Sequence, residues 1–335
     1  MTTLTTPGAA LQARRLVNLD QVAVATASTV VDGAADGCRA VDLRVAGGVD
    51  LRVLPDRGLD LAAAWFAGLP LAWISAVGES APLPLAREED WLLAFGGGLV
   101  TTCGLRNVGR PSEGHGQHGA VSQQRAREVR TRRRIADDGQ AELSITGTVD
   151  ETAGLTGHLR LERRATTRTG SGLVELTDTV TNLGGGVEPA PFLYHVNLGA
   201  PLWDADASLS VTAGEVVPRD DDARAGLNSW SQPPRPDAAG AERVFEHRLE
   251  PDPDGRASAT VTNPVVGLRL RLSWDAATLP RCHQWVHPAL GVLGIEPANC
   301  SVLGRAADRA AGTLPVLEAG QTRTTGLRIV VEPVA

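Results

Sequence analysis

The sequence predicts an all-β protein made of packed antiparallel sheets. Short runs of alternating apolar and polar residues recur along the chain, and turns rich in Gly, Pro and Asp separate them. Few windows keep an apolar period of 3.6 residues for more than two helical turns. The runs also do not alternate with long helices, which argues against a parallel α/β sheet, so we expect one large sandwich.

The predicted elements follow one another in hairpins. Residues 40–74 predict strands divided by GG, DRG and AGLP turns, and acidic residues before a glycine run predict a short helix at 88–98. Residues 141–184 alternate over several runs, as in an antiparallel meander with one apolar face. Residues 256–280 repeat the strand pattern, with Leu268, Leu270 and Leu272 on one face and Arg269 and Arg271 on the other, and residues 322–334 form a last strand.

The length of 335 residues is compatible with one continuous all-β unit, and we expect a single domain over 1–335. Residues 1–39 form a segment that leads into this domain. The stretch at about 218–244 is polar and rich in Pro, Gly and Asp. Because strand patterns flank it on both sides, we interpret it as a surface excursion of the same domain.

Composition limits the classes of partner. The net charge of −7 argues against nucleic acid, because phosphate binding needs a basic face. No apolar stretch reaches membrane-spanning length, and the N-terminus lacks a secretory signal pattern. The four Cys show no paired spacing, so we expect buried, reduced thiols and a cytoplasmic protein. No pattern indicates an oligomeric state.

Three distant stretches place a titratable side chain among small or turn-forming neighbours. They are HGQHGAV with His118, PFLYHVNLGAPL with His195 and LGIEPANC with Glu296, in a chain with only seven His. Two imidazoles and a carboxylate are sufficient to move one proton on and one proton off a small polar substrate at neutral pH.

Glu296 and His195 are the candidate catalytic residues. Pro297 lacks a backbone donor, so we expect the strand to end after Glu296 and to hold that carboxylate at a fixed angle, which suits a general base, although a salt bridge to an Arg is the alternative. Strand alternation places His195 and Asn197 on one face, where both could line a polar hollow. The alternative for His195 is a core imidazole bonded to backbone.

His115 and His118 lie three residues apart, a spacing that could hold a metal on a helix. Gly116 and Gly119 favour a loop instead, so the metal signal is weak and no cofactor is expected. If a divalent metal is bound, its candidate ligands are His115, His118 and His195. The alternative for His115 is an exposed loop residue.

Four further residues are candidates for substrate binding. His283 and Trp285 lie two residues apart and therefore share one face of a predicted strand. Trp285 could be a flat platform for a sugar ring or, equally, a core Trp. Arg57 in PDRGLDL and Asn107 in GLRNVGRP supply donors and acceptors for hydroxyl groups, although such residues are more often on the surface. Dinucleotide, P-loop and GxSxG motifs are missing from the sequence, which favours cofactor-free acid–base chemistry.

The chain resembles the galactose mutarotase-like superfamily and, within it, the aldose 1-epimerase-related family of unknown function (DUF4432-like). The resemblance runs from about residue 40 to the C-terminus through PDRGLDL, TTCGLRNVG, GQHGAVS, LYHVNLGAPL, GIEPANC and LEAGQT. It implies a single-domain antiparallel β-supersandwich with the site in a cleft on the concave sheet. It also implies a small-molecule carbohydrate as the partner.

The resemblance implies a role for each matching residue. His195 would protonate the ring oxygen of the sugar, Glu296 would take the proton of the anomeric hydroxyl, and His118 would help hold the substrate. The ring then opens, the C1–C2 bond turns and reclosure gives the other anomer. This is the reaction of an aldose 1-epimerase-like isomerase acting on a monosaccharide or a derivative.

Two alternatives stay open at this point. The same His and Glu could abstract a C–H proton beside the carbonyl of a keto-sugar, with or without a metal, giving epimerisation, isomerisation or elimination. The chain could also be a non-catalytic carbohydrate-binding protein that keeps the cleft.

Overall fold

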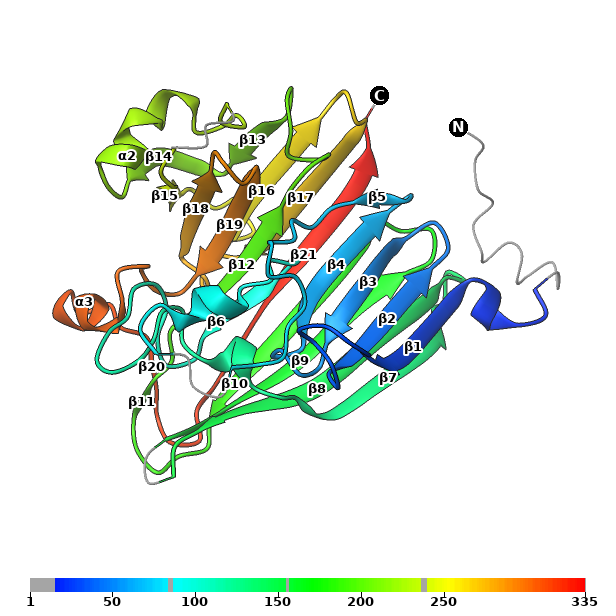
Figure 1. Ribbon diagram of the computed structural model, residues 1–335, viewed down its shortest axis with the longest axis horizontal. Helices are drawn as coiled ribbons and strands as arrows, with labels where there is room; N and C mark the ends of the chain where they lie inside the picture. Colours follow the sequence, from blue (N-terminus) through cyan, green and yellow to red (C-terminus); the bar gives the residue numbers. More distant parts are fainter. Residues whose placement is uncertain (1–15, 84–86, 155–156, 236–239, 335) are drawn as a thin grey trace.

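The computed structural model describes residues 16–83, 87–154, 157–235 and 240–334 and is built almost entirely of antiparallel strands (Figure 1). The largest sheet has eight strands, in the order β13-β16-β17-β21-β10-β9-β8-β7. In that order the strands are Ser208–Val211, Arg256–Asn263, Leu268–Asp275, Thr322–Pro333, Leu173–Asn182, His158–Arg168, Ala141–Thr152 and Arg127–Ile135.

Two smaller sheets cover the large one side by side (Figure 1). The five-stranded sheet runs in chain order: β1 (Ala23–Thr29), β2 (Arg39–Val45), β3 (Val49–Leu54), β4 (Asp60–Phe66) and β5 (Leu69–Pro70). The six-stranded sheet has the order β14 (Ala213–Pro218), β15 (Arg243–Leu249), β18 (Arg281–His287), β19 (Val292–Ala298), β12 (Phe192–Leu198) and β6 (Thr101–Gly104). A bridge between Ala72 and Leu198 joins them into one layer.

The remaining elements are short. β11 (Glu188–Pro189) pairs with β20 (Val316–Leu317). Among the described residues, the α-helices are α2 (Asp221–Ala225) and α3 (Arg305–Ala310), and the 3-10 helices are η1 (Leu19–Gln21), η2 (Asp90–Ala94), η3 (Val121–Gln123) and η4 (Leu227–Ser229). In the part of the chain that the structure describes, no helix combines the length and apolar character needed to cross a membrane.

The observed strands confirm the predicted all-β class and the antiparallel hairpins. The run at 40–74 forms β2 to β5, and the run at 141–184 forms β8 to β10. In β17 the Leu side chains are buried and the Arg side chains between them are exposed, because only one face of the large sheet meets the core. All four Cys are buried free thiols, as expected.

Two segments are more structured than the sequence indicated. The lead-in segment 1–39 contains β1, whose small and Thr-rich residues form an edge strand on β2, while residues 1–15 lie outside the described residues. The excursion at 218–244 joins two paired strands, β14 and β15, and holds α2 and η4; its residues 236–239 also lie outside the described residues.

Strands β12 and β19 are buried along their whole length. One face of each strand packs on the large sheet, and loops cover the other face. Tyr194 on β12 belongs to the main hydrophobic core, whereas Leu193 belongs to a second, smaller cluster with Trp91 and Phe95. Successive side chains of a strand point to opposite faces. These two strands therefore contribute side chains both to the main core and to the space between the six-stranded sheet and the loops that cover it.

A polar network inside the core anchors β12. Arg163 on β9 is fully buried, and its guanidinium donates to both carboxylate oxygens of Asp178 at 2.8 and 2.6 Å and to Asp60 Oδ1 at 3.0 Å. The Tyr194 hydroxyl donates to Asp178 Oδ2 at 2.8 Å. Thr102 on β6 donates to Asp60 Oδ1 at 2.6 Å and accepts from Arg163 at 2.8 Å. One guanidinium thus ties both layers of the sandwich together.

Replacement of Arg163 by Met tests this network. The change leaves two buried carboxylates, Asp178 and Asp60, without their cation, and we expect the free energy of unfolding to fall by about 3 to 5 kcal/mol. Arg164→Met on the same strand is the control, because Arg164 is half exposed and its pair with Glu142 contributes less than about 1 kcal/mol. Urea unfolding measures both variants, and equal stability losses would contradict the assigned role of the network.

Candidate active site

His195 and Glu296 meet on the covered face of the six-stranded sheet. β12 and β19 run antiparallel in the register that pairs Val196 with Ile295, so His195 and Glu296 face each other across the two strands. His195 Nε2 lies 3.2 Å from Glu296 Oε1, and both side chains are at most 5% exposed. Two residues a hundred positions apart in the sequence therefore form one contacting pair.

Gly294 makes room for this pair. A Cβ atom at that position would lie 3.0 Å from Glu296 Oε1, 3.1 Å from His195 Cε1 and 3.2 Å from the Trp285 Cβ. Such contacts are tighter than ordinary packing distances, so a side chain at Gly294 would push His195 and Glu296 apart. The glycine in LGIEP is a part of the site that the sequence did not single out.

Burial sets the protonation of the pair. Desolvation raises the pKa of Glu296 to about 7 and lowers the pKa of His195 to about 4. Both shifts disfavour charge, so the pair holds one proton between the two side chains over a broad pH range. His195 Nδ1 is buried and has no hydrogen-bond partner among the described residues. One mobile proton gives the pair one acid and one base at any moment.

A cavity of about 220 Å³ opens over the pair, and we call it the catalytic cavity. Aromatic rings form its walls: the ring centres of Phe95, Trp285 and Trp91 lie 5.2, 5.4 and 6.1 Å from that of His195. Phe95 follows η2, and Trp285 comes from β18. These rings exclude water and offer flat apolar faces, which suits a small ring-shaped ligand with polar edges.

His118 lines the same cavity from its loop. Its backbone has φ 56°, and the adjacent Gly119 has φ 71°, which agrees with the predicted loop in place of a helix. The ring packs on Trp91 with centres 4.6 Å apart, and its Nδ1 accepts from the Gly109 N–H at 3.4 Å. Burial lowers the pKa of His118 to about 3, so the ring is neutral and carries its hydrogen on Nε2, as a donor.

A charged clamp closes one rim of the catalytic cavity. Glu242 accepts from the Trp285 indole N–H at 2.9 Å and from Arg219 at 2.9 Å, and Arg219 also donates to Asp220 at 2.7 Å. Arg219 and Glu242 both line the cavity. They lie at the two ends of the excursion between β14 and β15, so this segment contributes to the site as well as to the surface.

The structure brings four of the predicted residues together and places the others elsewhere. His118, His195, Trp285 and Glu296 line the catalytic cavity. His283 does not; it is buried beside it with Nε2 3.2 Å from the Cys300 carbonyl oxygen, and it lines a neighbouring cavity.

Arg57, Asn107 and Asn197 do not line the catalytic cavity and bond to backbone instead. The Arg57 guanidinium donates to the carbonyl oxygens of Ser122 and Ala94, which pins η3 and η2 around the cavity. Asn107 donates to two carbonyl groups of the His118 loop. Asn197 donates to the carbonyl oxygens of Gly98 and His195. Their contacts support the walls of the site.

Sequence reasoning missed Trp91, Phe95, Arg219 and Glu242. Aromatic residues make up only 4% of the chain, so the two in DWLLAF, directly before three glycines, were a usable signal. No comparable signal marked Arg219 and Glu242, because the paired strands that bring them together are separated by a long polar segment.

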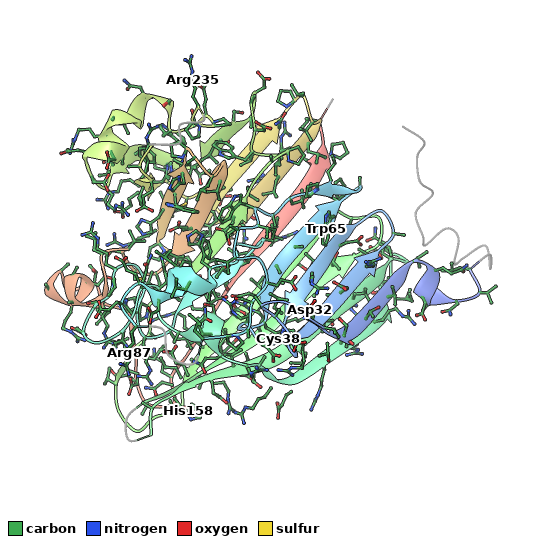
Figure 2. The ribbon with its side chains drawn as sticks, viewed as in Figure 1. Asp32, Cys38, Trp65, Arg87, His158 and Arg235 are labelled. Atoms are coloured by element: carbon green, nitrogen blue, oxygen red, sulfur yellow. The ribbon has the colours of Figure 1, made fainter. Side chains whose placement is uncertain are left out.

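Among the described residues, no group of three or more His, Cys, Asp or Glu side chains is arranged so that it could hold a metal ion. The candidate ligands His115, His118 and His195 therefore do not form such a group. Of the other histidines, His158 lies at the start of β9 (Figure 2) and its Nε2 is 3.0 Å from Asp150 Oδ1, outside the cavity.

Comparison with known proteins places the chain in a family. The model of a domain of unknown function, DUF4432, matches residues 35–331. The chain belongs to the DUF4432 family. No curated protein matches this DUF4432 chain in sequence.

Solved structures share the fold of this DUF4432 protein. A candidate aldose 1-epimerase from Klebsiella pneumoniae superposes with a TM-score of 0.83 at 20% identity, over 95% of this chain and 89% of that one. A galactose mutarotase-like protein from Clostridium acetobutylicum gives 0.62 at 12% identity, over 94% and 100%. A galactose 1-epimerase from Lactobacillus acidophilus gives 0.59 at 13% identity, over 93% and 100%. The DUF4432 chain therefore has the galactose mutarotase-like fold.

Proposed function

We propose that this protein is an aldose 1-epimerase-like isomerase, which interconverts the anomers of a monosaccharide or a close derivative by opening and closing the sugar ring. The proposal is carried by the 3.2 Å contact between His195 Nε2 and Glu296 Oε1 inside an aromatic-lined cavity. Two structures that share this fold are named as a candidate aldose 1-epimerase and a galactose 1-epimerase, which supports the proposal.

Ring opening needs one base and one acid at the same time. The base removes the proton of the anomeric hydroxyl while the acid gives a proton to the ring oxygen, so that the bond between C1 and the ring oxygen breaks and a carbonyl forms at C1. Rotation about C1–C2 and reversal of the two transfers give the other anomer. No electron leaves or enters the sugar, and the step needs no cofactor.

The assigned roles are His195 as the acid toward the ring oxygen and Glu296 as the base toward the anomeric hydroxyl. In the uncharged pair the mobile proton is on Glu296, since burial disfavours the ion pair. Transfer of that proton across the contact gives the imidazolium and the carboxylate that these roles require. Because the pair already holds its proton, no exchange with bulk water is needed during the reaction.

The remaining cavity residues suit a sugar ring with hydroxyl groups. Trp285 and Phe95 offer faces for the C–H groups of a ring, and His118 Nε2 offers a donor for a hydroxyl. Arg219 is neutralised by Glu242 and Asp220, whereas Arg110, which also lines the cavity, has no ion-pair partner among the described residues. The proposed partner is a small-molecule carbohydrate, and the cytoplasm stays the predicted location.

Substitution of the pair tests the proposal. We expect the wild type to accelerate the mutarotation of at least one aldose, and Glu296→Gln and His195→Asn each to lower that rate by about 10²- to 10⁴-fold, because each removes one proton-transfer group. Polarimetry from a pure anomer measures the rate, and Glu318→Gln at an exposed position is the matched control. If the wild type accelerates a broad aldose panel no more than buffer does, the proposal is wrong.

The same reaction in D₂O separates O–H chemistry from C–H chemistry. Ring opening moves protons between oxygen atoms only, so we expect the product to contain no deuterium on carbon by mass spectrometry after enzymatic equilibration. Deuterium beside the carbonyl would instead support abstraction of a C–H proton.

The pH profile follows from the single shared proton. Below about pH 4 His195 gains a proton and the pair has no base; above about pH 7 Glu296 loses its proton and the pair has no acid. We expect kcat/KM to form a bell between these limits, with apparent pKa values that belong to the pair. A rate that keeps rising from pH 7 to well above it would contradict this protonation scheme.

A further inference from the structure

A second cavity adjoins the catalytic cavity, and we call it the side cavity. It measures about 240 Å³, and Arg219, Val244 and Val302 line both cavities as a shared wall. At the rim of this wall the Arg110 N–H donates to the Val302 carbonyl oxygen at 3.2 Å. Exposed residues, Leu303 and Ala307 among them, border the side cavity, so it is open to solvent along the rim. The two cavities are therefore neighbours that share Arg219, Val244 and Val302 as lining residues.

The lining of the side cavity combines apolar patches with polar edges. Val217, Leu303 and Ala307 offer C–H surface, and Arg281 lies 2.7 Å from Glu246 as a partly exposed ion pair. Thr313 adds a hydroxyl. Apolar faces together with fixed charged donors and acceptors match the C–H faces and hydroxyl groups of a carbohydrate.

Charge argues against a phosphate or carboxylate in the side cavity. Its two cations are both occupied: Arg281 pairs with Glu246, and Arg219 pairs with Glu242 and Asp220. Among the described residues that line it, no further Lys or Arg is present. An anionic group would therefore have to break an existing ion pair, whereas uncharged hydroxyls can add hydrogen bonds to intact pairs.

We propose that the side cavity is a second sugar subsite, so that the preferred substrate is a short uncharged oligosaccharide with its reducing unit at His195 and Glu296. This inference rests on the proposed function. The side cavity is slightly larger than the catalytic cavity, so it has room for a ring of the same size. In an oligosaccharide only the reducing unit has a free anomeric centre, so this unit would lie at His195 and Glu296. The neighbouring sugar unit, joined to it by one glycosidic bond, would lie across the shared wall in the side cavity.

Filling the side cavity tests the inference. Ala307 on α3 is exposed and lines this cavity, whereas Ala310 on the same helix is exposed and does not line it. Mutarotation of glucose is compared with that of maltose, cellobiose and lactose, all of which have glucose as the reducing unit. Titration calorimetry gives the dissociation constants of the same sugars, so that the inference is decided even for a protein that turns none of them over.

We expect the wild type to have a lower KM and Kd for at least one of these disaccharides than for glucose. In Ala307→Trp the ratio of the glucose constant to the disaccharide constant should fall by about tenfold, because the indole occupies the second subsite. In Ala310→Trp this ratio should stay at the wild-type value.

The inference is overturned if glucose binds at least as tightly as every disaccharide, or if Ala307→Trp leaves the ratio unchanged. Glucose turnover without disaccharide preference would remove the second subsite and keep the proposed function. Preferential binding of a disaccharide without turnover of any sugar would support the second subsite and contradict the proposed isomerase function.

Discussion

The fold and the site both depend on β12, a strand that is buried on two faces and makes a polar side-chain contact on each of them. Tyr194 points into the sandwich and donates to Asp178, which Arg163 holds in place. His195, the next residue, points the opposite way and contacts Glu296. Because alternation along a strand is strict, fixing Tyr194 fixes the direction of His195. The buried ion pairs thus hold the imidazole in position as well as the two layers of the sandwich.

The chemistry then follows from desolvation. Aromatic rings and the large sheet remove water from both members of the pair, and this moves the pKa of the carboxyl up and the pKa of the imidazole down. An exposed Glu would be ionised near neutral pH, and an exposed His would be only partly protonated. The buried pair shares one proton instead and can give it from one side while it accepts from the other. Gly294 preserves this contact because it has no Cβ to separate the two groups.

Much of this architecture could be predicted from the sequence, since strand alternation and turn residues are local signals. The β17 pattern, the meander of β8 to β10 and the buried Cys are examples. Arg57 and Asn107 lie in the loops that the sequence indicated, but their side chains donate to backbone carbonyl groups. The direction of a polar side chain depends on its neighbours in the folded chain, which the local sequence does not show. The contact between Arg219 and Glu242 could not be predicted, because a long polar segment separates the two residues and produces no periodic sequence pattern. The family resemblance supplied the roles of His195 and Glu296, and the structure supplies their contact.

We propose above all that His195 and Glu296 act on the anomeric centre of a sugar ring. A crystal structure of Glu296→Gln soaked with a reducing sugar tests it most directly. We expect the sugar ring to lie against Trp285, with the ring oxygen within hydrogen-bond distance of His195 and the anomeric hydroxyl at the side chain of residue 296. A sugar bound elsewhere on the molecule, or one that presents a different carbon to the two side chains, would contradict it.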